Sequence, residues 1–113
     1  MIIISPAKSL NPQPRDCPLS PTLPGFLEDS QKLVNNLKKK SVKSLEAMMS
    51  VNKKIAKLNK DRFTEWQLPF SEKNATPATF LFRGEVYIGL NTGEFDESDL
   101  AFAQDHLRIL SGL

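Results

Sequence analysis

Residues 38–66 read KKKSVKSLEAMMSVNKKIAKLNKDRFTEW, and this stretch decides the fold that we expect. Residue types that favour the cap position before a helix occur at Ser41, Ser50 and Asn59, each followed by apolar residues at helical spacing. The stretch therefore predicts several short helices that begin at these caps. In the helix after Ser50, we expect an apolar stripe formed by Val51, Ile55 and Leu58.

The same stretch carries most of the positive charge. Between residues 38 and 62, nine Lys and Arg residues stand against two acidic residues, a local balance of +7, although the whole 113-residue chain has a net charge of only +2. From Gly84 to Leu113, six acidic residues stand against Arg108, a balance of −5. A basic block can bind an anionic partner such as nucleic acid, or it can be the solvated face of helices, and composition leaves both interpretations open.

Two segments outside this stretch are rich in strand-forming residues. Residues 1–5 form a short apolar, β-branched run ended by Pro6, which predicts one buried strand. Residues 80–90 contain Phe, Val, Tyr and Ile, interrupted by Arg83 and Gly84, which predicts two short strands with a turn or bend between them. Together with the helices, these segments predict an α+β fold with short strands and several short helices.

Two further helices are expected outside residues 38–66. One begins near Pro24, ends in a run of three lysines, and has apolar residues at helical spacing at Phe26, Leu33, Val34 and Leu37. The other begins at Asp96, where Asp99 completes the pattern of a capping box. We expect this helix to have Arg108 in its last turn and an apolar face formed by Leu100, Ala103, Leu107 and Leu110.

Proline is concentrated near the N-terminus. Six of the eight prolines lie between Pro6 and Pro24. Each proline lacks a backbone donor and disfavours helix at the residue before it, so residues 9–24 are expected to form an irregular segment. A segment of this length without structure of its own is commonly functional or mobile, and an ordered one needs a surface to lie on.

Cysteine content and the N-terminus bear on the cellular compartment. Cys17 is the single cysteine, so an internal disulfide is impossible and a reducing compartment fits best. The first apolar run is four residues long and has no basic segment before it, which is too short for the core of a signal peptide or for a membrane span. We therefore expect a cytoplasmic protein that has no membrane partner.

Four segments spread over the chain carry a resemblance to a known family. They are Ile4 to Lys8 (ISPAK), Asn59 to Trp66 (NKDRFTEW), Phe82 to Leu90 (FRGEVYIGL) and Phe102 to Leu113 (FAQDHLRILSGL). In their order and spacing, they closely resemble the N-terminal part of the bacterial peroxide stress resistance protein family named YaaA. Members of that family are more than twice this length. The resemblance thus implies that residues 1–113 are the N-terminal part of a single, incomplete domain.

The resemblance also has a consequence for the C-terminus. In the family, the last segment would continue past Leu113 with a second glycine and another helix, which implies a partial helix-hairpin-helix and a larger mixed fold. Gly112 matches the first glycine of that hairpin, where backbone N–H groups can approach DNA phosphates. As an alternative, Gly112 is an ordinary helix end. A chain cut there is expected to expose apolar surface on Leu107, Leu110 and residues 80–88.

Family members are associated with hydrogen peroxide stress, keep intracellular free iron low and bind double-stranded DNA. The resemblance implies the same role here, a stress-response protein that limits oxidative DNA damage and contacts DNA largely without regard to sequence. The residues that we expect to contact DNA are six basic side chains and one glycine, namely Lys8, Lys53, Lys57, Lys60, Arg62, Arg83 and Gly112. For Arg62, a structural role in stacking on Trp66 is an alternative.

Two other functional classes stay open. One is an enzyme that acts on a nucleotide or a nucleic-acid lesion, with Ser5 and Lys8 binding an anion after the first strand. The other is an inactive fragment. No glycine-rich phosphate loop, Ser-His-Asp order or CxxC motif occurs, so no enzyme class is indicated, catalytic residues are unknown and no small-molecule substrate is identified. We expect no cofactor and no metal site, because His106 shares a helix face only with Asp99.

Overall fold

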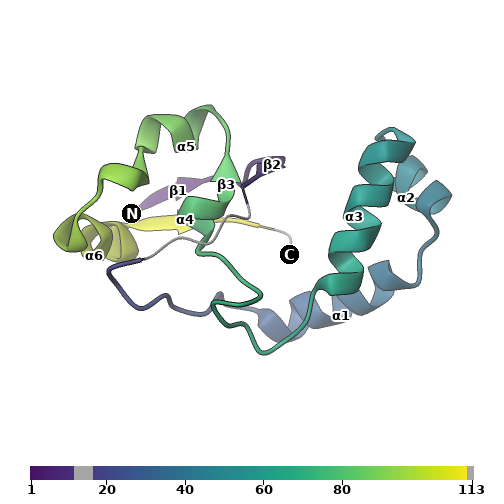
Figure 1. Cartoon of the computed structure of the whole chain (residues 1–113), viewed down its shortest axis with the longest axis horizontal. Coiled ribbons are helices and arrows are strands. Elements are labelled where there is room, and N and C mark those ends of the chain that lie inside the picture. The colour runs from purple at the N-terminus through teal and green to yellow at the C-terminus, as the bar shows by residue number, and fades with distance from the viewer. Residues whose placement is uncertain (12–16, 112–113) are drawn as a thin grey trace. The chain divides into compact units, whose positions relative to one another are not determined.

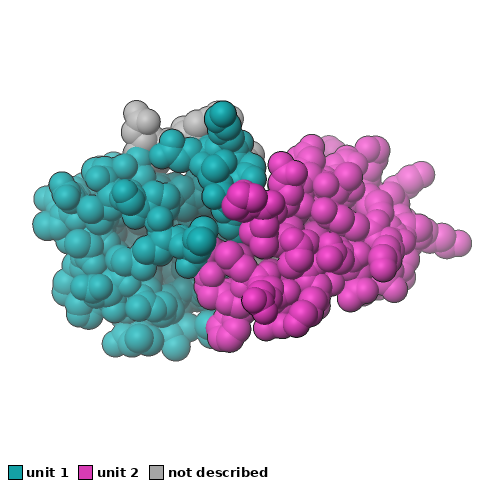
Figure 2. All heavy atoms as spheres, turned by 90° about the horizontal axis from the view of Figure 1, so that it is seen from below, with its two compact units in different colours: residues 1–23, 70–112 teal, residues 24–69, 113 magenta. Residues whose placement is uncertain are grey.

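The computed structural model of this chain describes residues 1–11 and 17–111, and it forms two compact units (Figure 2). Unit 1 combines the described parts of residues 1–23 and 70–112, and unit 2 is residues 24–69. The described residues contain helices together with short strands, so the expected α+β character is confirmed. Residues 12–16 of the proline-rich segment and Gly112 of the expected hairpin lie outside the described residues.

Unit 2 consists of three helices, α1 (Leu27–Lys38), α2 (Val42–Met49) and α3 (Lys53–Glu65) (Figure 1). Its core is formed by Leu45 of α2 with Ala56 and Phe63 of α3. Leu37, Val42 and Val51 pack against these three side chains. Val34 of α1 is also fully buried, so every helix of unit 2 contributes apolar side chains to the interior.

Of the two serine caps expected in unit 2, one is confirmed and one is wrong. The backbone N–H of Ser44 donates to Oγ of Ser41, 3.1 Å away, at the start of α2. Ser50 instead ends α2 in the left-handed conformation, with φ 53°. Asn52 caps α3, where its Oδ1 accepts from the N–H of Ile55 at 3.0 Å. Because Ser50 turns the chain between the helices, the extended residue that can cap α3 comes two positions later.

The expected cap at Asn59 and the expected apolar stripe of α3 are also wrong. Asn59 lies inside a continuous helix, and its Nδ2 donates to the backbone oxygen of Ile55 at 2.9 Å. Ile55 and Leu58 are exposed, whereas Ala56 and Phe63 are buried. These two lie seven residues apart, which places them on one face of the helix, and both pack with Leu45 of α2.

Unit 1 contains two small sheets (Figure 1). β1 (Ile2–Ile4) pairs in parallel with β4 (Leu107–Ile109), with Ile2 opposite Leu107. β2 (Ser9–Leu10) pairs antiparallel with β3 (Phe82–Arg83), with Ser9 opposite Arg83. The strand expected in residues 1–5 is confirmed, but its expected burial is wrong because Ile2 and Ile3 are exposed.

The proline-rich segment differs from the prediction at its start. Residues 9–24 were expected to be irregular throughout, yet the first two of them are β2. No proline lies at these two positions, so both can join a sheet. Residue 11 and residues 17–24 lie outside helices and strands, as predicted.

Two helical segments connect β3 to the last helix of unit 1, and α4 (Ala78–Leu81) precedes β3. After β3 come α5 (Glu85–Leu90), the 3-10 helix η1 (Thr92–Glu94) and α6 (Glu97–His106). The second strand expected in residues 80–90 is therefore wrong, because residues 85–90 are α5. The helix turns Tyr87 inward and leaves Val86 and Ile88 exposed. Tertiary packing of the tyrosine thus overrides the strand preference of its neighbours.

The capping box expected at the start of α6 is confirmed. The N–H of Asp99 donates to Oδ1 of Asp96 at 2.9 Å, and the N–H of Asp96 donates to Oδ2 of Asp99 at 3.2 Å. The N–H of Asp99 stabilises the Asp96 carboxylate most, and the hydroxyl of Ser98 contributes less. Both bonds lower the pKa of Asp96.

The expected extent of this last helix is wrong. α6 ends at His106, and the next three residues form β4, so Leu107, Arg108 and Leu110 do not belong to a helical face or a last turn. The N–H of Leu110 donates to the backbone oxygen of Ile4 at 3.1 Å, which extends the pairing with β1. The leucine spacing fits a helix locally, and pairing with a strand about a hundred residues away in sequence decides against it.

Candidate nucleic-acid interface

Charge is distributed unevenly between the two units. Unit 2 contains ten Lys and Arg residues and five acidic residues, a balance of +5. Unit 1 contains five Lys and Arg residues and eight acidic residues, a balance of −3. The net charge of +2 therefore hides one basic unit and one acidic unit, and a polyanion would be attracted to unit 2.

The first two turns of α3 carry the exposed cations of unit 2 that sequence reasoning singled out. Lys53 and Lys57 are exposed and lie four residues apart, so they stand on one face of the helix. Lys57 pairs with Asp61, with Nζ and Oδ2 3.1 Å apart, and both side chains are more than half exposed. Such a surface ion pair is worth at most about 1 kcal/mol, so a phosphate can replace the carboxylate.

Lys60 takes a different role from its neighbours on α3. Its Nζ donates to the backbone oxygen of Lys38 and, at 2.7 Å, to that of Lys40, at the C-terminal end of α1. Those carbonyls lack partners inside α1, and a cation is favoured beside them. Nζ of Lys38 in turn donates to the backbone oxygen of Trp66 at 2.9 Å. The two lysines tie the end of α1 to α3, so Lys60 has a structural function.

Arg62 lies apart from the exposed lysines. It is half-buried in the last turn of α3, where the helix dipole favours a cation. Nine residues separate it from Lys53, which at about 100° per residue places the two on opposite sides of the helix. The structure therefore groups Lys53 with Lys57 and separates both from Arg62.

Sequence reasoning did not name Lys54 as a contact residue. It is exposed in the first turn of α3, next to Lys53. The signal for it is the basic block itself, because three lysines fall within five residues at positions 53, 54 and 57. With Lys54 included, the exposed N-terminal half of α3 presents three cations, and we call this set the α3 lysine face.

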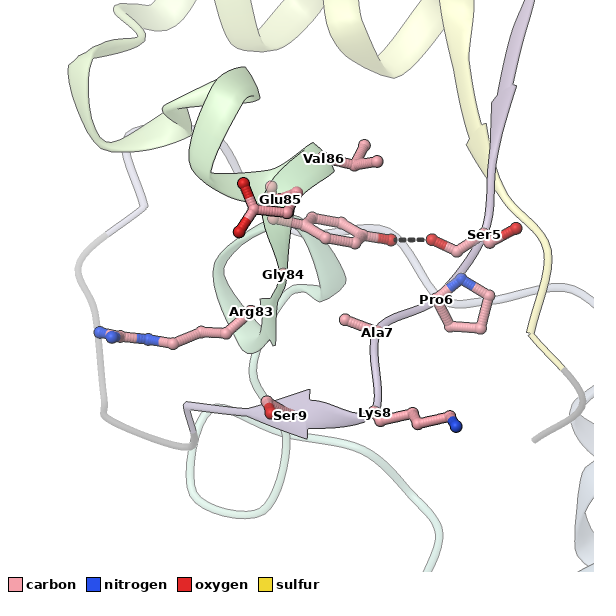
Figure 3. Close-up of a pocket in the computed structure, with 10 residues that line it drawn as sticks. Ser5, Pro6, Ala7, Lys8, Ser9, Arg83, Gly84, Glu85 and Val86 are labelled. Carbon is pink, nitrogen blue, oxygen red and sulfur yellow. Dashed lines mark hydrogen bonds between the residues drawn. The ribbon is translucent and has the colours of Figure 1, made fainter.

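In unit 1, the two expected cations line one shallow pocket of about 360 Å³ (Figure 3). Lys8 and Arg83 are both exposed. They extend to opposite sides in Figure 3 and do not converge on one point. The pocket is bounded by the turn after β1, by β2 and β3 and by the start of α5. Its lining includes the negative side chain of Glu85 as well as the two cations.

Tyr87 and Gly84 shape this pocket. The hydroxyl of Tyr87 donates to the backbone oxygen of Ser5 at 2.6 Å, which fixes the turn after β1 against α5 (Figure 3). Burial of the ring raises the pKa of Tyr87. A Cβ at Gly84 would lie 3.3 Å from Cβ of Ala7, so the absence of a side chain there lets the two segments pass closely. Sequence reasoning did not identify Tyr87, because it was assigned to a strand.

The part of the chain that the structure describes has neither a cluster of metal-binding side chains nor a membrane-spanning helix. Among residues 1–11 and 17–111, no group of three or more His, Cys, Asp or Glu side chains could hold a metal ion. His106 has its ring stacked on Phe102 with centroids 3.9 Å apart, and its Nδ1 lies 2.8 Å from the Phe102 backbone oxygen. Within the same residues, no helix has both the length and the apolar character needed to cross a membrane.

Comparison with known proteins covers the whole chain. A family model described as "Peroxide stress protein YaaA" matches residues 1–113. A protein of Saccharophagus degradans described as "UPF0246 protein" is 45% identical over 116 residues, which span 100% of this chain and 44% of the relative. Proteins with the same description from Alcanivorax borkumensis and Teredinibacter turnerae are each 42% identical over 113 residues, with the same coverage of 100% and 44%. This chain thus spans less than half the length of these relatives.

Proposed function

The chain belongs to the family of the peroxide stress protein YaaA, and from this premise we propose that it serves the cellular response to hydrogen peroxide by binding double-stranded DNA. The binding is electrostatic and largely independent of sequence. The proposed role includes limiting oxidative damage to DNA and lowering intracellular free iron in the cytoplasm. The relatives are more than twice as long as this chain, and the proposal concerns the share that its residues contribute.

The observation that carries the DNA proposal is the α3 lysine face on a unit of net charge +5. Lysine is a point charge on a flexible stem, which suits contact with a phosphate but not the two-pronged recognition of a base edge. The three cations span five residues of α3, a rise of about 6 Å, which is similar to the length that about two phosphates occupy along one strand. This arrangement supports affinity without base readout.

The other expected contacts contribute differently to the proposal. Lys8 and Arg83 in unit 1 are exposed and available to phosphates. Lys60 instead binds backbone oxygens at the end of α1, and Arg62 is half-buried in the last turn of α3. Gly112 stays a proposed backbone contact that lies outside the described residues. We assign the largest share of the affinity to the α3 lysine face.

Fluorescence anisotropy with a random-sequence duplex at several salt concentrations tests this function. Each lysine that neutralises a phosphate adds about 0.9 to the slope of log affinity against log salt. The double variant Lys53→Gln/Lys57→Gln should therefore lower the slope by about 2. The control is Lys32→Gln/Lys73→Gln, which makes the same change in net charge at two exposed lysines outside the α3 lysine face.

Two results would contradict the proposal. One is a wild-type affinity that does not change with salt, because phosphate contacts release counterions. The other is an equal loss of slope in the two double variants, which would assign the effect to net charge and not to the α3 lysine face.

The proposed effect on free iron is tested separately, by electron paramagnetic resonance of chelatable iron in peroxide-treated cells with and without the protein. Equal signals in the two cultures would contradict this part of the proposal.

A second candidate function rests on the pocket of unit 1. Its volume of about 360 Å³ lies within the range of small-molecule sites, and Ser5 and Lys8 supply a hydroxyl and a cation at its lining. These features favour an enzyme that acts on a nucleotide or a nucleic-acid lesion. Calorimetric titration with nucleoside monophosphates tests this second function. If Lys8→Gln binds them as tightly as the wild type, this pocket is excluded as the site.

A further inference from the structure

The parallel pair β1 and β4 leaves apolar surface exposed on unit 1. Ile2 and Ile3 of β1 are 58% and 59% exposed, although both are β-branched residues in a strand. Phe102 of α6 is 62% exposed, and Leu110, directly after β4, is 65% exposed. Exposed apolar side chains are ordinary when scattered, but these belong to one sheet and the helix that leads into it. Ile2 and Ile3 are consecutive in β1 and project from opposite faces, so both faces of this sheet carry exposed apolar side chains.

A groove adjoins the same strands. It has a volume of about 230 Å³ and is lined mainly by apolar side chains, from Ile2, Leu90, Phe95, Phe102, Ala103 and Leu107. These residues come from β1, β4, α5 and α6 together with the loop before α6. The groove can therefore accept an apolar side chain from a segment that lies along the sheet.

A sheet of this kind is not expected to stand alone. Parallel strands almost always have both faces covered, and an isolated two-stranded sheet is marginally stable. Within residues 1–11 and 17–111, neither outer edge of the β1 and β4 pair has a further strand. An open edge presents unpaired N–H and C=O groups that template the addition of another strand.

The relatives indicate what covers this surface. This chain is matched over 98 to 100% of its length by four relatives and spans 43 to 44% of each. The share outside the match is therefore nearly constant, at more than half of each relative, which is enough chain to supply further strands. We propose that the β1 and β4 pair and its groove are the docking surface for an apolar β-strand from the part of the family's length that this chain does not span.

The proposal is tested first with the chain as it is. Overlapping peptides that cover the unmatched part of the Saccharophagus degradans relative are presented to the purified protein, and binding is measured by fluorescence. We expect a contiguous set of peptides with alternating apolar residues to bind the wild type. Ile3→Lys should weaken that binding by about tenfold or more, because a strand added beside β1 would cover Ile3 on the sheet face opposite the groove and remove water from the introduced charge. The control is Met48→Lys on α2, the same kind of change at an apolar residue 54% exposed.

A second measurement covers the case in which a single peptide is too short to bind. The chain is fused to the unmatched part of the same relative, and Ile3→Lys is introduced into the fusion and into the chain alone. The substitution should lower the melting temperature of the fusion markedly and that of the chain alone very little, because Ile3 is already exposed there. Met48→Lys should have a small effect in both.

Three results would overturn the proposal. The first is that no peptide binds and that Ile3→Lys lowers the melting temperature of the fusion no more than that of the chain alone. The second is an equal effect of Ile3→Lys and Met48→Lys, which would remove the assignment to the sheet. The third is a wild-type dimer in sedimentation that Ile3→Lys dissociates, which would assign the surface to a second copy of the chain. None of these measurements depends on DNA binding.

Discussion

Replacement of Lys60 by methionine tests whether this lysine is structural, in contrast to the lysines that we propose as DNA contacts. Methionine keeps the length and apolar stem of lysine and removes the ammonium group. In the structure, that group donates to the backbone oxygens of Lys38 and Lys40. The variant therefore removes the partner of two carbonyls at the end of α1 while leaving the side-chain packing largely intact.

The expected loss of stability follows from these two bonds. A hydrogen bond to a charged group contributes about 1.5 to 3 kcal/mol. Lys40 is exposed and Lys38 is half-buried, so water can replace the ammonium at least in part. We therefore expect Lys60→Met to lower the free energy of unfolding by about 1.5 to 3 kcal/mol in total, the value of one such bond and not of two. For a domain of about 100 residues, this lowers the melting temperature by about 6 to 15 °C.

Circular dichroism at 222 nm, followed through thermal and urea unfolding, measures this loss. Lys57→Met is the matched control, because Lys57 is on the same helix and makes only an exposed ion pair. We expect it to change the free energy of unfolding by less than about 1 kcal/mol. In the DNA assay, the order reverses: Lys57→Met lowers the salt slope by about 1, and Lys60→Met leaves it unchanged. Equal stability of the two variants would refute the structural assignment of Lys60.

Three further predictions concern the cores, the caps and a buried phenol. Leu45→Ala, at a side chain with no exposure, should destabilise unit 2 by about 2 to 5 kcal/mol in urea unfolding. Asn52→Ala should cost about 1 kcal/mol and Ser50→Ala less than about 0.5 kcal/mol, and the opposite order would restore Ser50 as the cap of α3. Tyr87→Phe should cost about 1 kcal/mol at pH 7 by removing the bond to the Ser5 oxygen. The pKa of Tyr87 is raised in the folded state, so folding favours the protonated phenol. This contribution to the free energy of unfolding is present below pH 10 and is lost as the pH rises above that value. The free energy of unfolding should therefore fall less steeply at alkaline pH in Tyr87→Phe than in the wild type.

Local sequence signals were sufficient where a helix start depends on one side chain. Ser41 and the pair Asp96 and Asp99 were identified as caps because the residue types and their spacing satisfy the first free N–H groups of the next helix. The same signal failed at Ser50 and Asn59. Both residues have suitable side chains, but a cap also needs an extended backbone, which the turn between helices decides.

Contacts between distant parts of the sequence could not be predicted in this way. Leu107 and Leu110 fit the helical spacing that starts at Leu100, and the local pattern contains nothing that ends the helix at His106. β4 exists because Leu107 finds Ile2 as its partner, and that pairing depends on the fold of all of unit 1. The basic block was evident from composition, whereas the inward turn of Lys60 depends on where α1 ends.

The two units present surfaces of opposite character, and this bears on which partner each can accept. Unit 2 has a charge of +5, so its free energy of interaction with a polyanion is favourable over a Debye length of about 8 Å at physiological salt. Unit 1 has a charge of −3 and exposes isoleucine beside a groove of apolar side chains. A phosphate cannot replace the water lost from an apolar surface, whereas a neutral β-strand can satisfy the open backbone groups and cover the isoleucines. On these grounds we expect nucleic acid to favour the α3 lysine face and a polypeptide to favour the β1 and β4 pair.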